Sequence, residues 1–307
     1  MKCPFTAHLQ HARNGFTMVE LLIVIAMIGI LTAIVVPAAS SLQGAANATT
    51  ELAAARRTTQ AWRNWSIDHN GRLIASQLEP SAPLPPNVAP THHNGTLIPD
   101  IARRRWLWRL WDYFEDPVQT IWAGGQRRWW DSVMDGPGDM TTKLYVATLH
   151  PCLGLNGEWL GGRQSNDSDT WTLSQYMRSQ DELAVPLFTE TLAQLKRPAD
   201  LTLFASARGS DTASGGQPIE GWWRIEPPYR PGMDQGQLNW TTDDSGAFVT
   251  PTATSQPSDA GFVSARHGGR SVIAAPDGSA RVEHFGRLGD MRRWADPALS
   301  HNWSPAF

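Results

Sequence analysis

A run of 24 residues near the N-terminus constrains this chain more than any other feature. Residues 16–39 read FTMVELLIVIAMIGILTAIVVPAA, and between Leu21 and Val36 only Thr32 carries a polar side-chain group. At about 1.5 Å per residue, a helix of this length spans about 36 Å, enough to cross a hydrocarbon core of roughly 30 Å. The 15 residues before it are basic. The positive-inside rule therefore predicts a cytoplasmic N-terminus and an exported remainder.

One acidic residue, Glu20, lies within this apolar run. A carboxylate in a membrane span costs roughly 2.5–3.5 kcal/mol at the centre and less near the end, so its presence indicates a function. If the chain is cut after Gly15, the new α-amino group of Phe16 is a cation four residues before Glu20. Pairing that cation with Glu20 of a neighbouring copy would neutralise both charges and set the stagger between helices. This ion pair would therefore connect cleavage after Gly15, the Glu20 carboxylate and self-assembly of the subunits.

Residues 15–22, GFTMVELL, resemble the class III signal of type IV prepilins and type II secretion pseudopilins. The resemblance implies that prepilin peptidase cuts after Gly15 and N-methylates Phe16, and that Glu20 is the assembly carboxylate. Pro37 falls where many members of this family have a helix-bending proline. The implied partners are prepilin peptidase, other pilin or pseudopilin subunits, an inner-membrane assembly platform and the membrane itself.

Two other interpretations of the N-terminus explain less. An ordinary secretory signal has an apolar core of about 7–15 residues and small residues before its cut, which Pro37-Ala38-Ala39-Ser40 could supply. That interpretation leaves Glu20 unexplained, and the apolar run is too long for it. A plain signal anchor explains the length but not the glutamate. The prepilin interpretation is the one that accounts for both.

The rest of the chain predicts an exported globular domain. The formal net charge is −3 and the leader carries +2, so the remainder carries −5, and no nucleic-acid partner is predicted. Of two cysteines, only Cys152 survives removal of the leader, which excludes an internal disulfide and favours a buried structural thiol. The expected location is the bacterial inner membrane, single-pass, with the C-terminal domain periplasmic or in an extracellular filament.

The predicted fold class is α+β: a long N-terminal helix, with a transmembrane half and an amphipathic half, packed on a small antiparallel sheet as in pilins. Its outer half has apolar positions at helical spacing, at Leu42, Ala45, Ala46, Thr49, Leu52 and Ala53, with Trp62 and Trp65 on a neighbouring stripe. Asn70-Gly71 is a helix stop. Short strands are predicted at 143–149, 201–206, 222–226 and 271–275. The predicted divisions are a leader (1–15), a transmembrane and assembly helix (16–39), a helical stalk (40–70), a proline-rich linker (71–100) and a periplasmic domain (101–307) with a C-terminal hairpin (264–285).

A tryptophan-rich block follows the prolines, with the sequence RRRWLWRLWDYFEDP at 103–117. A single helix would place Trp106, Leu107, Leu110, Trp111 and Phe114 on one face. We expect that face, with Trp122, Trp129 and Trp130 beyond it, to be core. The alternative is an exposed aromatic surface that stacks on sugars, which would make the protein a membrane-tethered, periplasmic carbohydrate-binding protein.

The C-terminal region has a hairpin signature, two apolar-rich strands around Pro276-Asp277-Gly278. His267 is followed by nine residues and then Asp277-Gly278. This spacing resembles the H-X9-DG domain found at the C-terminus of many proteins with a prepilin signal. Residues 156–162, NGEWLGG, resemble the central region of that group less specifically. As plain structure, His267 caps the hairpin and Asp277 makes its turn.

Several function classes lack their motifs. The sequence has no Gly-x-Ser-x-Gly, His-Glu-x-x-His or Cys-x-x-Cys, and none of its three lysines follows a glycine, so a phosphate-binding loop is absent. Two ligands such as His267 and Asp277 do not make a metal site, and the acidic stretches at 166–169 and 243–244 are typical of solvated loops. We therefore predict no enzyme, no cofactor and no metal, and a minor pilin or pseudopilin rather than a major pilin.

Overall fold

The structure is a computed structural model that describes residues 17–78, 92–93, 96–162, 188–211, 215–230 and 237–303. The chain divides into two compact units, residues 1–45 and residues 46–307, and each is described by itself. Helix α1 (Met18–Asp68) contributes to both units. Its residues 46–68 are called the body segment, because they belong to the same unit as the folded body of residues 46–307.

Helix α1 ends where the sequence predicts. Asn70 and Gly71 both have positive φ, 57° and 76°, and the Gly71 amide donates to the carbonyl of Ser66 at 2.7 Å. A left-handed backbone at this point closes the last helical turn, and glycine adopts it without strain. The helix assignment continues without a break through Pro37.

The body segment buries a different face from the one predicted. Within this segment Ala46, Thr49 and Ala53 are exposed and Leu52 is half-buried, so the predicted packing face is wrong there. Leu42 and Ala45, which belong to the other unit, are also exposed. The buried positions instead follow the stripe of the two tryptophans: Glu51, Ala54, Ala55, Thr58, Thr59, Ala61, Trp62, Trp65 and Ser66. The large indoles of Trp62 and Trp65 have more apolar area to bury than a row of alanines, and they decide which face turns inward.

The body is built around a five-stranded sheet, and the α+β class is confirmed. Its strand order is β11-β10-β4-β3-β7, and every neighbouring pair is antiparallel except β3 and β7, which makes the sheet mixed. The strands are β3 (Leu153–Asn156), β4 (Phe204–Ser206), β7 (Arg224–Ile225), β10 (Arg270–Ala274) and β11 (Ala280–His284).

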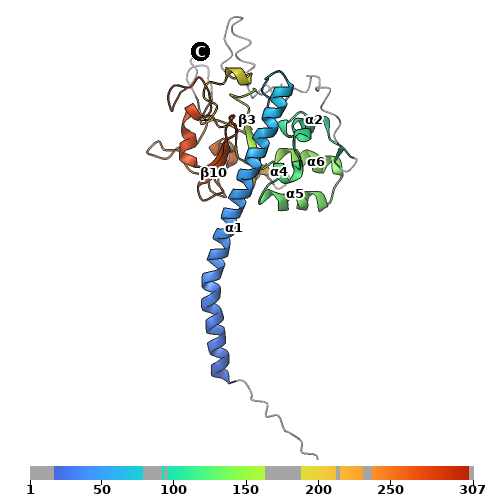
Figure 1. Cartoon of the computed structure of the whole chain (residues 1–307). Coiled ribbons are helices and arrows are strands. Elements are labelled where there is room, and N and C mark those ends of the chain that lie inside the picture. Colours follow the sequence, from blue (N-terminus) through green and yellow to red (C-terminus); the bar gives the residue numbers. More distant parts are fainter. Residues whose placement is uncertain are drawn as a thin grey trace, which may run out of the picture. The chain divides into compact units, whose positions relative to one another are not determined.

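Alternating side chains divide the core between the two faces of this sheet. On β10, Val272 and Ala274 join the apolar cluster that contains Trp62 of α1, whereas Ile273 joins a second cluster with Trp240 and Trp294. This alternation is the two-residue period of a strand buried on both faces. Figure 1 shows helices α2, α4, α5 and α6 on one side of the body segment and β10 on the other.

The remaining elements are short. The helices are α2 (Asp100–Arg103), α3 (Trp106–Arg109), α4 (Pro117–Ile121), α5 (Gln126–Asp135) and α6 (Met140–Leu149). The 3-10 turns are η1 (Trp111–Tyr113), η2 (Leu192–Gln194), η3 (Pro257–Ala260), η4 (Phe285–Gly289) and η5 (Met291–Arg293). Three two-stranded ribbons pair β1 (His92–His93) with β2 (Thr96–Leu97), β5 (Arg208–Asp211) with β6 (Gln217–Glu220), and β8 (Tyr229–Arg230) with β9 (Gln237–Leu238).

The predicted strand at 143–149 is wrong, because these residues form the end of α6. Asp139 caps this helix by accepting from the amide of Thr142 at 2.9 Å. Leu144, Ala147 and Thr148 then fall at helical spacing on a buried face. The β-branched and aromatic residues of this segment favour a strand locally, but the aspartate cap and tertiary packing decide the outcome.

Residues just after α1 pack against the NGEWLGG segment. Leu73 and Ile74 are buried. A Cβ on Gly157 would overlap the Ser76 side chain, and one on Gly161, whose φ is 79°, would overlap the carbonyl of Ile74. Two glycines of this segment are therefore required by the close approach of residues 74–76. The proline-rich stretch at 79–91 lies outside the described residues.

Candidate functional site

The first candidate region is the start of α1. Thr17 and Glu20 form a reciprocal cap: the Glu20 carboxylate accepts from the Thr17 amide at 2.9 Å and hydroxyl at 2.7 Å, and the Glu20 amide donates to the Thr17 hydroxyl at 3.2 Å. This capping box satisfies backbone donors that a helix start leaves open. Glu20 therefore has a local role in starting the helix, which sequence analysis missed although Thr-x-x-Glu is its signature. Gly15 and Phe16 lie outside the described residues.

The apolar segment that follows has the properties of a membrane span. Met18–Val36 has a mean hydropathy of 2.9, and its side chains are exposed within the chain. By length and composition this helix is able to cross a bilayer. Within its unit, the exposed apolar surface has no protein core to cover it, which is the opposite of the body segment.

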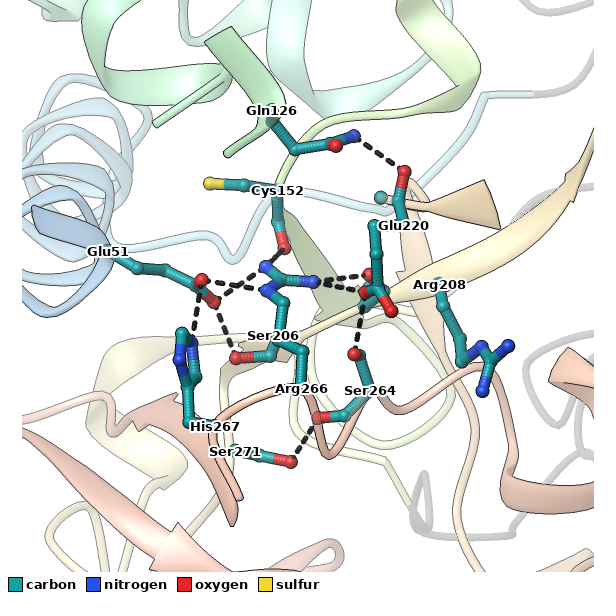
Figure 2. A network of polar contacts seen from close by, with 12 residues as sticks. Glu51, Gln126, Cys152, Ser206, Arg208, Glu220, Ser264, Arg266, His267 and Ser271 are labelled. Atoms are coloured by element: carbon teal, nitrogen blue, oxygen red, sulfur yellow. Dashed lines mark hydrogen bonds and ion pairs between the residues drawn. The ribbon is translucent and has the colours of Figure 1, made fainter. Parts of the chain in front are cut away.

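The second candidate region is a buried polar network centred on Glu51 of the body segment and Arg266 (Figure 2). The Glu51 carboxylate receives the Arg266 fork, with Nη2 at 2.7 Å and Nε at 2.9 Å, and His267 Nε2 lies 3.0 Å away. The Ser206 hydroxyl on β4 also donates to Glu51. Glu51 is 3% exposed. An ion pair this deeply buried is stable only when its hydrogen-bonding capacity is filled.

The Arg266 guanidinium meets that condition. Its Nη1 donates to Glu220 at 2.8 Å and to the carbonyl of Ala207 at 2.9 Å, and its Nη2 also donates to the carbonyl of Cys152 at 2.8 Å. With the Nε hydrogen bond and the Nη2 ion-pair contact to Glu51, all three guanidinium nitrogens have acceptors. Figure 2 shows the guanidinium lying between the two carboxylates. The Ser264 hydroxyl also donates to Glu220 Oε2, at 2.6 Å.

The electrostatics of the network keep both groups charged. Burial raises the pKa of Glu51, but the charge of Arg266 and the hydrogen bonds from His267 and Ser206 outweigh it and hold the pKa below its ordinary value. Burial likewise lowers the pKa of Arg266, and Glu51 and Glu220 together more than reverse that effect. Burial, followed by the nearby Glu51 charge, raises the pKa of the Cys152 thiol to about 12.

That thiol is buried, as predicted, and its raised pKa keeps it protonated and unreactive. The Ser206 hydroxyl is held within the network, because it donates to the Glu51 carboxylate and accepts from the amide of Val272. The network is therefore a set of tertiary contacts that joins the body segment of α1 to the C-terminal part of the chain.

The C-terminal motif residues are not brought together. The predicted hairpin forms, with Val272 opposite Val282 in the register of β10 and β11. His267 lies at its open end and Asp277 in its turn. Asp277 makes the turn as predicted, because its carboxylate accepts from the Ser279 amide at 2.9 Å and hydroxyl at 2.7 Å. The prediction that His267 caps the hairpin is wrong, since its side chain bonds to Glu51 of α1 instead.

The tryptophan block is core rather than surface. Trp106, Trp108, Trp122 and Trp130 are each at most 4% exposed, so the expectation of a buried aromatic cluster is confirmed for these four. Trp111 and Trp129, which were also predicted to be core, are only half-buried. The predicted single helix is wrong, because the chain turns after α3 and continues as η1. The four buried indoles cannot stack on a sugar.

No group of three His, Cys, Asp or Glu side chains suited to a metal occurs among the described residues. Asp243 is committed to its own loop, where its carboxylate accepts from the amides of Ser245 and Ala247. The other acidic stretch, at 166–169, lies outside the described residues.

Comparison with known families identifies the N-terminal segment. Residues 10–36 match the family model of the prokaryotic N-terminal methylation motif. The match spans the predicted cleavage junction, Glu20 and the apolar run, so the chain has a prepilin-type N-terminus, the kind that prepilin peptidase processes. The match does not extend to the body. No curated protein and no solved structure matches this chain.

Sequence analysis missed Glu51, the centre of the network. A signal for it was present, because stepping back from Trp62 along the buried face by four, three and four residues reaches Thr58, Ala55 and Glu51. A lone acid on that stripe requires a cationic partner from elsewhere in the chain. Which of the chain's arginines supplies it could not be read from spacing.

Proposed function

We propose that this protein is a pilin-like or pseudopilin-like structural subunit and not an enzyme. Prepilin peptidase cuts it after Gly15 and N-methylates Phe16, and the subunit assembles through its N-terminal helix into a type IV pilus or type II secretion filament. The single observation that carries the proposal is the methylation motif at residues 10–36, coincident with the exposed apolar helix Met18–Val36.

The physical argument for assembly concerns Glu20. Its side chain hydrogen-bonds to Thr17, and among the residues that the structure describes no cation pairs with its negative charge, which lies in a segment suited to lipid. A charge in that position is stabilised by a cation at the same depth. Cleavage after Gly15 would create one, the α-amino group of Phe16, and a neighbouring pilin or pseudopilin subunit could present it. Pro37 is expected to bend the helix where it leaves the membrane, with the N-terminus in the cytoplasm and the body periplasmic.

N-terminal mass spectrometry of the protein purified from cells tests the processing step. The expected mature chain begins at methylated Phe16, and Gly15→Leu should abolish that species and leave Met1 in place. A mature chain beginning near Ser40 would contradict the proposal, because Glu20 would have been removed.

Cross-linking in intact cells tests the assembly step. Glu20→Ala should insert in the inner membrane and be cleaved normally, but should lose its cross-links to other pilin-like subunits and to the assembly platform. Thr17→Ala is the matched control, since it removes the partner in the capping box while keeping the charge. Normal filament incorporation of Glu20→Ala would refute the assembly role.

A further inference from the structure

The C-terminal hairpin contacts the body segment of α1 at two separate points. At its open end, Arg266 and His267 hold the Glu51 carboxylate. At its turn, Arg63 Nη1 donates to the carbonyl of Asp277 at 2.5 Å. On the helix, Glu51 and Arg63 are twelve residues apart. On the hairpin, His267 and Asp277 are ten residues apart, and these are the residues that begin and end the H-X9-D spacing.

The turn is shaped to present that carbonyl. The Asp277 side chain is occupied by Ser279, and the amides of Gly278 and Ala275 close the turn onto Ala275 and Ser279 at 3.0 and 2.9 Å. Gly278 has a φ of 97°, which disfavours any side chain, and a Cβ there would lie 3.6 Å from Arg63 Nη1. An aspartate followed by glycine therefore makes the turn whose carbonyl accepts from Arg63.

The two spacings agree in length. Twelve residues of α-helix rise about 18 Å. Of the nine residues between His267 and Asp277, the five of β10 extend about 17 Å, and the other four lie outside the strand at its two ends. The strand therefore reaches from the turn of α1 that contains Glu51 to the turn that contains Arg63. A hairpin of another length would engage one of these residues and miss the other.

We propose that the hairpin is a two-point clamp that sets the position of the body along α1, with His267 at one end and Asp277-Gly278 at the other. The nine residues between them act as a ruler for the distance from Glu51 to Arg63. This role goes beyond the proposed function, because it requires neither cleavage nor assembly and applies to the unprocessed chain as well.

Hydrogen exchange of the full-length protein in detergent micelles tests the two contacts separately. His267→Ala should speed exchange about tenfold in the turn of α1 around Glu51, and Arg63→Ala should do so near residues 62–66. Each effect should stay at its own end. His267→Gln, which keeps a side-chain donor, is the matched control and should remain close to wild type. Unchanged exchange in both alanine variants would overturn the clamp.

A register experiment tests the ruler. Two residues inserted after Ala274 and two before Ala280 should move the turn about 6.8 Å along α1, away from Arg63. Arg63→Ala with Ile67→Arg moves the cation four residues, about 6 Å, in the same direction. Ile67 is 66% exposed and accommodates the change. The lengthened hairpin alone should exchange about tenfold faster near the turn, and the paired substitutions should restore protection.

The same paired substitutions on the native hairpin should fail to protect, and that contrast separates a ruler from general stability. Protection that does not return in the lengthened, repositioned variant would overturn the ruler. If the lengthened chain does not fold, the Arg63→Ala and His267→Ala results decide the clamp by themselves.

Discussion

Two of the carboxylates on helix α1, those of Glu20 and Glu51, lie in opposite environments. Glu20 stands on the exposed apolar segment and its hydrogen bonds go to Thr17, one turn away. Glu51 stands on the buried stripe and is bonded by Arg266, His267 and Ser206, from parts of the chain 155 to 216 residues distant. The Glu51 charge is paired by cations from the folded body, whereas no cation pairs with Glu20 among the described residues. The difference shows that folding neutralises Glu51, and under the proposed function a neighbouring subunit neutralises Glu20.

Glu51→Ala should cause the largest loss of stability of the variants considered. It leaves the Arg266 guanidinium buried with two N–H groups unpaired, and removing one partner of a buried ion pair costs roughly 3–5 kcal/mol. Denaturant unfolding of the full-length protein in micelles measures the loss of stability. Processing of the N-terminus should be unchanged, because the cleavage junction lies in the other unit. A stability equal to wild type would contradict the role of the network.

Ser206→Ala should have a smaller effect of the same kind. The hydroxyl donates to the Glu51 carboxylate and accepts from the amide of Val272, so its removal weakens one charged hydrogen bond and leaves one amide without its acceptor. A loss of about 1.5–3 kcal/mol is expected in the same unfolding measurement. Ser300→Ala, at an exposed position near the C-terminus, is the control and should unfold like wild type.

Lowering the pH should reduce the stability that the Glu51 network contributes. The pKa of Glu51 in the folded protein lies below its ordinary value of 4.5, so its contribution is complete above pH 4.5 and is lost as the pH falls through the lower folded value. Unfolding midpoints between pH 6 and pH 2 should therefore fall less steeply for Glu51→Gln than for wild type. Equal slopes for the two proteins would argue against a charged Glu51.

Glu20→Ala should have the smallest effect on stability and the largest on partners. Because the Glu20 side chain is exposed and local in its contacts, the unfolding midpoint of the body should not move. A thermal melt followed by tryptophan fluorescence is a suitable measure, since the indoles report on the body. A lowered midpoint would mean that Glu20 supports folding, and the contrast with Glu51 would fail.

Much of the fold was accessible from local patterns. The helix stop at Asn70-Gly71 and the hairpin around Pro276-Asp277-Gly278 were predicted from residue type and spacing, and both are confirmed. Burial of the tryptophan block was predicted in the same way and is confirmed except at Trp111 and Trp129, which are half-buried. The errors fall where two local patterns compete. Residues 143–149 suit a strand or a helix, and α1 offers two possible stripes, so contacts with distant residues made the choice.

The N-terminal segment was determined by the sequence alone, because its properties need no tertiary partner. Length and apolarity define a membrane span, and a leader ending in glycine, followed by Glu20 five residues on, defines the methylation motif. The Glu51 network was decided only by the tertiary structure, since the residues that bond Glu51 lie 155 to 216 residues away from it in the chain. A charge on a buried face of the sequence indicates that an oppositely charged partner is needed. Only the tertiary structure shows which arginine supplies it.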